Sequence, residues 1–251
     1  MSRLPDDIRI SQISMLGTHD TMALYGTDDL VCQSLPLHTQ LNAGVRMLDI
    51  RCKNEDGKLK IYHRNKYEGM ELKDVLDTIV SFFKAHPRET ILMRLGNEAR
   101  NKGTEFDQLF NESYWTPYKQ YFWQYSKNNN NPTLSEVRNK IVLMPNFSPR
   151  STTYGLTINW NQDNKYLRDE YEIGAIWNLY EKWRKVQTYL ENANTDVNNL
   201  YFNFLSGTYG VFPYFVASGQ SSPQTSAPLL LTGKLDCDDW PEFPRMLGSI
   251  A

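Results

Sequence analysis

The chain has 251 residues, 40% hydrophobic and 22% charged, a composition that can fill a hydrophobic core and excludes a wholly disordered protein. Its net charge is −2 at pH 7, and without a basic excess we expect no nucleic-acid partner. No apolar run in the sequence approaches the length of a membrane span, and the first seven residues lack the apolar segment of a signal peptide. We therefore expect a cytoplasmic protein or the mature form of a secreted one, with only peripheral membrane contact.

The three cysteines are Cys32, Cys52 and Cys237. Their odd number and the absence of a Cys-x-x-Cys pair predict neither a disulfide framework nor a zinc site. We expect each of them to be buried as a small hydrophobic side chain.

Short apolar runs alternate with longer amphipathic segments, which is typical of an α/β protein. The runs predict strands at 13–16, 45–51, 59–62, 90–95, 141–144, 156–160 and 200–204. Apolar residues at three- and four-residue spacing predict helices over 72–83 and 177–190. Seven strands with helices between them favour a (β/α) barrel over an open sheet, in a single domain spanning 1–251.

Three segments fall outside this alternation. The aromatic stretch at 114–125 is expected to pack in the core. Residues 128–132 and 217–228 are rich in Asn or in Ser, Gly and Pro, and predict loops.

Polar residues follow three of the predicted strands. His19 and Asp20 come directly after the first strand, and Asp49 and Arg51 lie on one face at the end of the second. His63 ends the third. Because the carboxyl ends of barrel strands face the active site, we expect these side chains to converge.

Two histidines and an arginine suit metal-free phosphoryl transfer. One imidazole can accept a proton and the other can donate one, while the guanidinium binds the developing negative charge. A carboxylate such as Asp49 can align that arginine.

These residues resemble a known family. Leu16-Gly17-Thr18-His19-Asp20, Asp49-Ile50-Arg51 and His63 are similar to the X domain of bacterial, metal-independent phosphatidylinositol-specific phospholipase C. The similarity continues through segments 87–93, 140–143, 162–164 and 200–206, in the family's order.

The resemblance implies a distorted TIM-type (β/α) barrel that cleaves phosphatidylinositol, or a glycosylated form, to diacylglycerol and a cyclic inositol phosphate. It assigns His19 as general base on the inositol 2-hydroxyl, and His63, with Asp20 as its partner, as general acid. Arg51, aligned by Asp49, would stabilise charge on phosphorus. The substrate-binding residues would be Asp163, Tyr166 and Arg64. It also implies no metal or other cofactor, and a monomer that meets its phospholipid substrate at a membrane surface.

The sequence departs from the family pattern in two places. The family's aspartate on the last barrel strand, which orients the general base, has no match here, and the last strand or strands are expected to be absent. Two basic residues that bacterial members carry near the site are replaced in Leu95-Gly96-Asn97-Glu98 and Met144-Pro145-Asn146.

Two alternatives stay open. One is a catalytically impaired protein that binds a lipid headgroup or a partner with the same fold, which the missing aspartate favours. The other is a metal-dependent enzyme similar to the glycerophosphodiesterases, which would need a carboxylate cluster around a divalent ion. Arg51 stands where it would repel such an ion.

Overall fold

The computed structural model describes residues 1–27, 29–99, 105–126, 129–148, 154–161, 163–175, 178–211, 213 and 216. The loop predicted at 217–228, Cys237 and the segment where a closing strand was expected to be absent lie outside this part of the chain. Within it, no helix is long and apolar enough to cross a membrane.

The architecture is α/β, as predicted, and its centre is a row of parallel strands. These are β1 (Gly17–Thr18), β2 (Met47–Glu55), β5 (Ile91–Asn97) and β6 (Ile141–Asn146), which pair in that order. A second, two-stranded parallel sheet contains β7 (Leu167–Arg168) and β8 (Phe202–Asn203). This succession of parallel strands is that of a distorted (β/α) barrel.

An antiparallel hairpin interrupts the barrel pattern after β2. Strand β3 (Lys58–His63) runs back along the end of β2, and β4 (Lys66–Glu71) pairs with β3 at the edge of the sheet. The sequence did not predict β4, because its polar residues are those of an edge strand with little apolar alternation.

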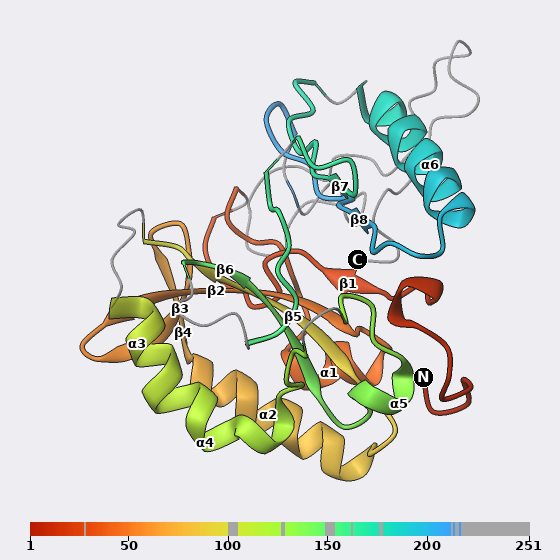
Figure 1. Ribbon diagram of the computed structural model, residues 1–251. Helices are drawn as coiled ribbons and strands as arrows, with labels where there is room; N and C mark the ends of the chain where they lie inside the picture. The colour runs from red at the N-terminus through yellow and green to blue at the C-terminus, as the bar shows by residue number, and fades with distance from the viewer. Residues whose placement is uncertain are drawn as a thin grey trace.

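The helices flank the sheet. They are α1 (Leu37–Asn42), α2 (Leu72–Ala85), α3 (Glu105–Phe110), α4 (Thr116–Tyr118), α5 (Leu134–Val137) and α6 (Leu179–Thr195), with short helical turns at Ile10–Gln12, Asn111–Trp115 and Lys119–Tyr121. Figure 1 shows α2, α3 and α4 along one side of the sheet, while β7, β8 and α6 gather on the other side.

Helix α2 shows how the sequence builds the core. A capping box between Glu71 and Asp74 fixes its start, and its apolar stripe, including Leu76 and Ile79, is fully buried against the sheet. The aromatic stretch also packs in the core, as predicted: Tyr114, Trp115, Phe122 and Trp123 are all buried.

Two predicted strands differ from the structure. The first strand is β1 at Gly17–Thr18, directly after the predicted 13–16. No strand forms over 156–160; Gly155 makes only an isolated bridge with Leu143. The contact at Gly155 is so close that a Cβ there would lie 2.0 Å from the Leu143 carbonyl oxygen. Strand β7 was not predicted, and it is only two residues long.

Candidate active site

The registers of β1 and β3 bring the first and third candidate motifs together on β2, the strand that carries the second. Thr18 pairs with Leu48 in parallel, and Ile61 pairs with Cys52 in antiparallel. Asp20 lies two residues after Thr18, and His63 lies two residues after Ile61. Because the two strands run in opposite directions along β2, both residues arrive beside Ile50. The expectation of three parallel strand ends was therefore wrong for His63: its strand runs the other way, and the antiparallel register delivers it to the same place.

Asp20 is the centre of the cluster. One carboxylate oxygen, Oδ2, lies 3.0 Å from His19 Nε2 and 3.4 Å from His63 Nε2. The other oxygen, Oδ1, lies 2.6 Å from Arg51 Nε. The side chain is 2% exposed, and its backbone has a φ of 43°, a left-handed conformation that aspartate tolerates better than most residues. This turn directs the carboxylate back toward β2.

Asp49 forms the floor of the cluster. Its Oδ2 accepts a hydrogen bond from Arg51 Nη2 at 3.0 Å and lies 3.2 Å from His19 Nδ1. Its backbone amide donates to Thr21 Oγ1, and the Thr21 amide donates to its carbonyl oxygen. The loop after β1 is therefore bound to β2 at the residue that also holds Arg51.

His63 is held from two sides. Its Nδ1 lies 2.7 Å from the Leu30 carbonyl oxygen. A carbonyl can only accept, so Nδ1 carries a hydrogen and Nε2 is the atom that faces Asp20. The buried carboxylate of Glu68 on β4 accepts hydrogen bonds from the amides of Leu24 and Tyr25, and thereby anchors the loop that carries Leu30.

The electrostatics favour a charged His19. Burial alone would lower its pKa, but the charge of Asp20 and hydrogen bonds to Asp20 and Asp49 raise the pKa to about 9. Burial alone would raise the pKa of Asp49, yet the Arg51 and Arg94 guanidinium groups hold that pKa well below its usual value. The cluster therefore stabilises an imidazolium between two carboxylates.

Comparisons with known proteins identify the family to which this chain belongs. The profile of "Phosphatidylinositol-specific phospholipase C, X domain" matches residues 17–146, the segment that contains every residue of the cluster. The chain belongs to this family. A 1-phosphatidylinositol phosphodiesterase of Listeria monocytogenes is 35% identical over 225 residues, which cover 83% of this chain and 68% of the relative.

Solved structures agree with the sequence match. The phosphatidylinositol-specific phospholipase C of L. monocytogenes superimposes with a TM-score of 0.75 at 31% identity, covering 85% of this chain and 81% of that one. An S. aureus phosphatidylinositol-specific phospholipase C, solved for work on the modulation of its membrane binding, gives 0.73 at 26% identity and covers 88% and 82%.

The structure adds residues to this phospholipase C-like site that the sequence motifs missed. Arg94 on β5 is in register with Asp49, and its Nη1 lies 3.6 Å from Asp49 Oδ2. Its guanidinium also stacks 4.5 Å from the Trp160 ring centre. A single arginine inside an apolar strand was the available signal for Arg94. Nothing in the sequence indicated Glu68, which lies on an unpredicted strand.

The predicted substrate-binding residues lie at different distances from the cluster. Arg64 directly follows His63, and its side chain reaches Asp29 at 3.8 Å. Asp163 is exposed, and its Oδ1 accepts a hydrogen bond of 3.4 Å from Asn159 Nδ2. Tyr166 packs edge-on against Tyr201. No described contact joins Asp163 or Tyr166 to the histidines, so their roles stay predictions.

Proposed function

We propose that this chain is a phosphatidylinositol-specific phospholipase C that cleaves the glycerol–phosphate bond by histidine acid–base chemistry. The attacking group is the inositol 2-hydroxyl, and the products are diacylglycerol and a cyclic inositol phosphate. Membership of the family and the match to phosphodiesterases along most of their length support this reaction.

One observation carries the proposal. A single buried oxygen, Asp20 Oδ2, lies between His19 Nε2 and His63 Nε2, while Arg51 binds the other oxygen of the same carboxylate. Two proton-transfer groups and a cation thus share one centre, which is what a displacement at phosphorus needs: a base, an acid and a charge acceptor.

His19 is suited to the role of general base. In its neutral form it accepts the proton of the 2-hydroxyl, and the imidazolium that results is stabilised by Asp20 and Asp49. This stabilisation of the charged imidazole is the contribution a carboxylate makes in a catalytic triad. Asp49 can therefore supply some of the support that the family's C-terminal aspartate provides.

His63 is suited to the role of general acid. Its Nδ1 hydrogen is engaged by the Leu30 carbonyl oxygen, so the proton that it transfers to the departing diacylglycerol oxygen comes from Nε2. That atom faces Asp20 Oδ2 at 3.4 Å, so the carboxylate can orient the imidazole for the transfer.

Among the residues that the structure describes, Arg51 Nη1 has no hydrogen-bond partner and can receive a phosphate oxygen. Its Nε and Nη2 contact Asp20 and Asp49. Its Nη1 has the Glu98 carboxylate at 3.9 Å, beyond hydrogen-bond length. We infer that Nη1 binds the charge that develops on phosphorus, that Asp163, Tyr166 and Arg64 bind the headgroup, and that the monomeric protein works at a membrane surface.

Phosphorus NMR of the protein with short-chain phosphatidylinositol micelles, with and without EDTA, tests the proposal. A cyclic phosphodiester signal in both samples is the expected result. A signal lost with EDTA would indicate the metal-dependent alternative. A folded protein that binds the micelles and yields no product would indicate the catalytically impaired binding protein.

A further inference from the structure

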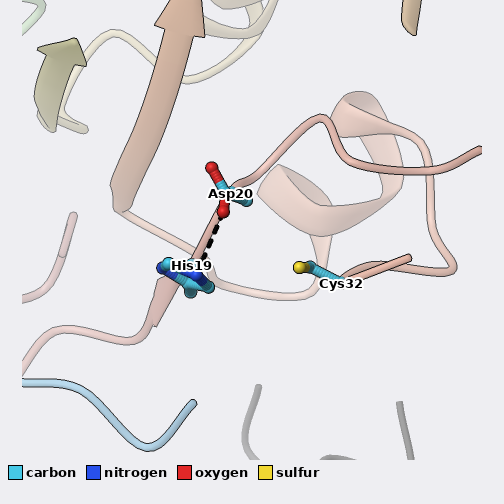
Figure 2. Close-up of side chains that lie close together, drawn as sticks. All are labelled: His19, Asp20 and Cys32. Atoms are coloured by element: carbon cyan, nitrogen blue, oxygen red, sulfur yellow. Dashed lines mark ion pairs between the residues drawn. The ribbon is translucent and has the colours of Figure 1, made fainter. Parts of the chain in front are cut away.

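A thiol that the proposed reaction does not use lies beside the two residues at its centre. Figure 2 shows the Cys32 sulfur directed toward His19 and Asp20. One ligand atom from each of these three residues can be chosen so that all three atoms lie within 4.8 Å of one another. Nitrogen, carboxylate oxygen and sulfur are the donor set that Zn²⁺ takes in proteins.

The loop after β1 holds Cys32 in this position. The amides of Cys32 and Gln33 both donate to the Ala23 carbonyl oxygen, which closes the loop on itself. The Gln33 side chain donates to the His19 carbonyl oxygen at 2.8 Å. Cys32 is therefore tied to the same turn that carries His19 and Asp20. None of these three contacts uses the Cys32 side chain, so a substitution at Cys32 leaves their atoms in place.

The charge around the cluster suits a divalent cation. Four carboxylates gather here, those of Asp20, Asp49, Glu68 and Glu98, against two guanidinium groups, those of Arg51 and Arg94. These six groups by themselves carry an excess of two negative charges when the histidines are neutral. A bound divalent ion can offset that excess.

Arg51 does not occupy the oxygen that the ion would need. Its Nε lies against Asp20 Oδ1, whereas His19 contacts Asp20 Oδ2. Arg51 therefore leaves Asp20 Oδ2 sterically open, while its positive charge lowers the affinity of the cluster for a cation.

We propose that His19, Asp20 and Cys32 form a binding site for a soft divalent ion, Zn²⁺ in the first place, whose occupancy inhibits the enzyme. At zinc bond lengths of about 2.0 to 2.3 Å, tetrahedral donors stand about 3.5 Å apart. The three donor atoms lie within 4.8 Å of one another, so the longest separation has to shorten by roughly 1.3 Å at most. Binding releases one proton from the Cys32 thiol and one from a protonated His19, both to solvent.

The inhibition of turnover by Zn²⁺ rests on the proposed function, whereas the binding of the ion does not. An ion on His19 occupies the lone pair that would accept the 2-hydroxyl proton. It also fixes Asp20, on which His63 and Arg51 depend. We therefore expect reversible loss of turnover with Zn²⁺ and recovery with EDTA.

Cobalt spectroscopy tests the site without reference to activity. Co²⁺ replaces Zn²⁺ in N, O and S sites, and a thiolate ligand gives a near-ultraviolet charge-transfer band. The full-length protein is titrated with Co²⁺ alone, beside Cys32→Ala, Cys32→Ser and a matched Cys52→Ala control. Cys52 is a buried core thiol on β2, so its removal leaves the three donors in place.

The expected result is a charge-transfer band in the wild type and in Cys52→Ala that is absent from both Cys32 variants. Calorimetry with Zn²⁺ should show affinity reduced more than about 100-fold in Cys32→Ser, because even supporting residues around a metal are worth about 10- to 100-fold. A wild-type protein without the band, or Cys32 variants that keep it, would overturn the site.

Zinc inhibition then separates the two proposals. Inhibition constants for Zn²⁺ should rise in Cys32→Ser and not in Cys52→Ala, each measured against the metal-free activity of the same variant. Equal inhibition of both variants would place the inhibitory ion elsewhere and overturn the regulatory inference. A cobalt band in a protein that makes no cyclic phosphodiester would sustain the metal site and refute the catalytic proposal alone.

Discussion

The region from β1 to β6 and the region that contains β7, β8 and α6 are built differently. The first has a six-stranded sheet above a large buried cluster that includes Leu48, Ile50 and Met93. The second has two strands of two residues each and a small cluster of Ile173, Leu179 and Val216. Every residue proposed for proton transfer lies in the first region.

Contacts between the regions show what the second one contributes. Phe204, just after β8, packs edge-on against the His19 ring with centroids 6.0 Å apart, and its ring also lies 5.8 Å from the Arg94 guanidinium. We infer that the six-stranded sheet positions the reacting groups, while the less regular region packs against them through Phe204. Variants in the two regions should therefore separate chemistry from stability.

The largest expected effect is in the first region. His19→Ala and His63→Ala should each reduce turnover of short-chain phosphatidylinositol by about 100- to 10,000-fold, the usual contribution of a positioned acid or base. His38→Ala is the matched control, because His38 is exposed and contacts only Thr39 by hydrogen bond among the described interactions. Full activity in either site variant, with folding shown by circular dichroism, would contradict the role of that histidine.

Arg51→Lys should cost about 100- to 1,000-fold in kcat, the range for loss of one preorganised donor to a developing oxyanion. A lysine ammonium cannot reproduce the guanidinium fork that contacts Asp20 and Asp49 while presenting a third nitrogen. Arg46→Lys is the control: Arg46 pairs with Glu89 at the start of β2 and lies outside the cluster. Equal kcat values for the two variants would show that the fork is dispensable.

Lys182→Met should affect stability rather than chemistry. The buried Lys182 ammonium on α6 donates to the carbonyl oxygens of Glu170 and Phe204. Its removal leaves both without this donor and should lower the free energy of unfolding by about 1–3 kcal/mol. Urea denaturation measures the loss, with Lys185→Met, which removes an exposed partner of Glu170, as the control.

Turnover per folded molecule should change little in Lys182→Met. Among the described contacts, Lys182 reaches Phe204, which packs on His19, and none of the reacting groups. A loss of kcat as large as that of Arg51→Lys, at unchanged stability, would break the proposed division between the two regions.

The smallest expected effect is a pH dependence of stability from the same lysine. Burial lowers the pKa of Lys182 to about 8, against an ordinary value of 10.5, despite the nearby charges of Asp169 and Glu170; Lys185 and Arg168 lower it further. Between these pH values the unfolded chain holds a proton that the folded chain has released, so stability should rise as pH increases from about 8 to 10.5. The penalty for burying the charge is complete below pH 8.

Comparing denaturation of the wild type with that of Lys182→Met isolates this contribution. The stability difference between the two proteins should widen in favour of the wild type across that interval. A difference that stays constant from pH 7 to pH 10.5 would show that Lys182 titrates in the fold as it does in water.

Several features of the fold could be predicted from local pattern alone. Strands β2, β3, β5 and β6 lie close to the apolar runs that predicted them, and α2 follows its amphipathic stripe. Strand β8 lies inside the apolar run predicted at 200–204, whereas β7 is too short for alternation to identify. Residues 156–160 look like a strand but make no ladder. Their conformations depend on contacts such as the Gly155–Leu143 approach, which local sequence does not encode.

The sequence by itself determined the chemical inventory of the site: His19, Asp20, Asp49, Arg51 and His63, and the family to which their spacing points. Only the tertiary structure decided how they meet. Opposed registers on β2 bring Asp20 and His63 to one point, and β5 and the loop after β1 add Arg94 and Cys32. The physical reason is that residue type and local periodicity are properties of neighbours in the chain, whereas a shared carboxylate oxygen is set by strand pairing between segments that are distant in sequence.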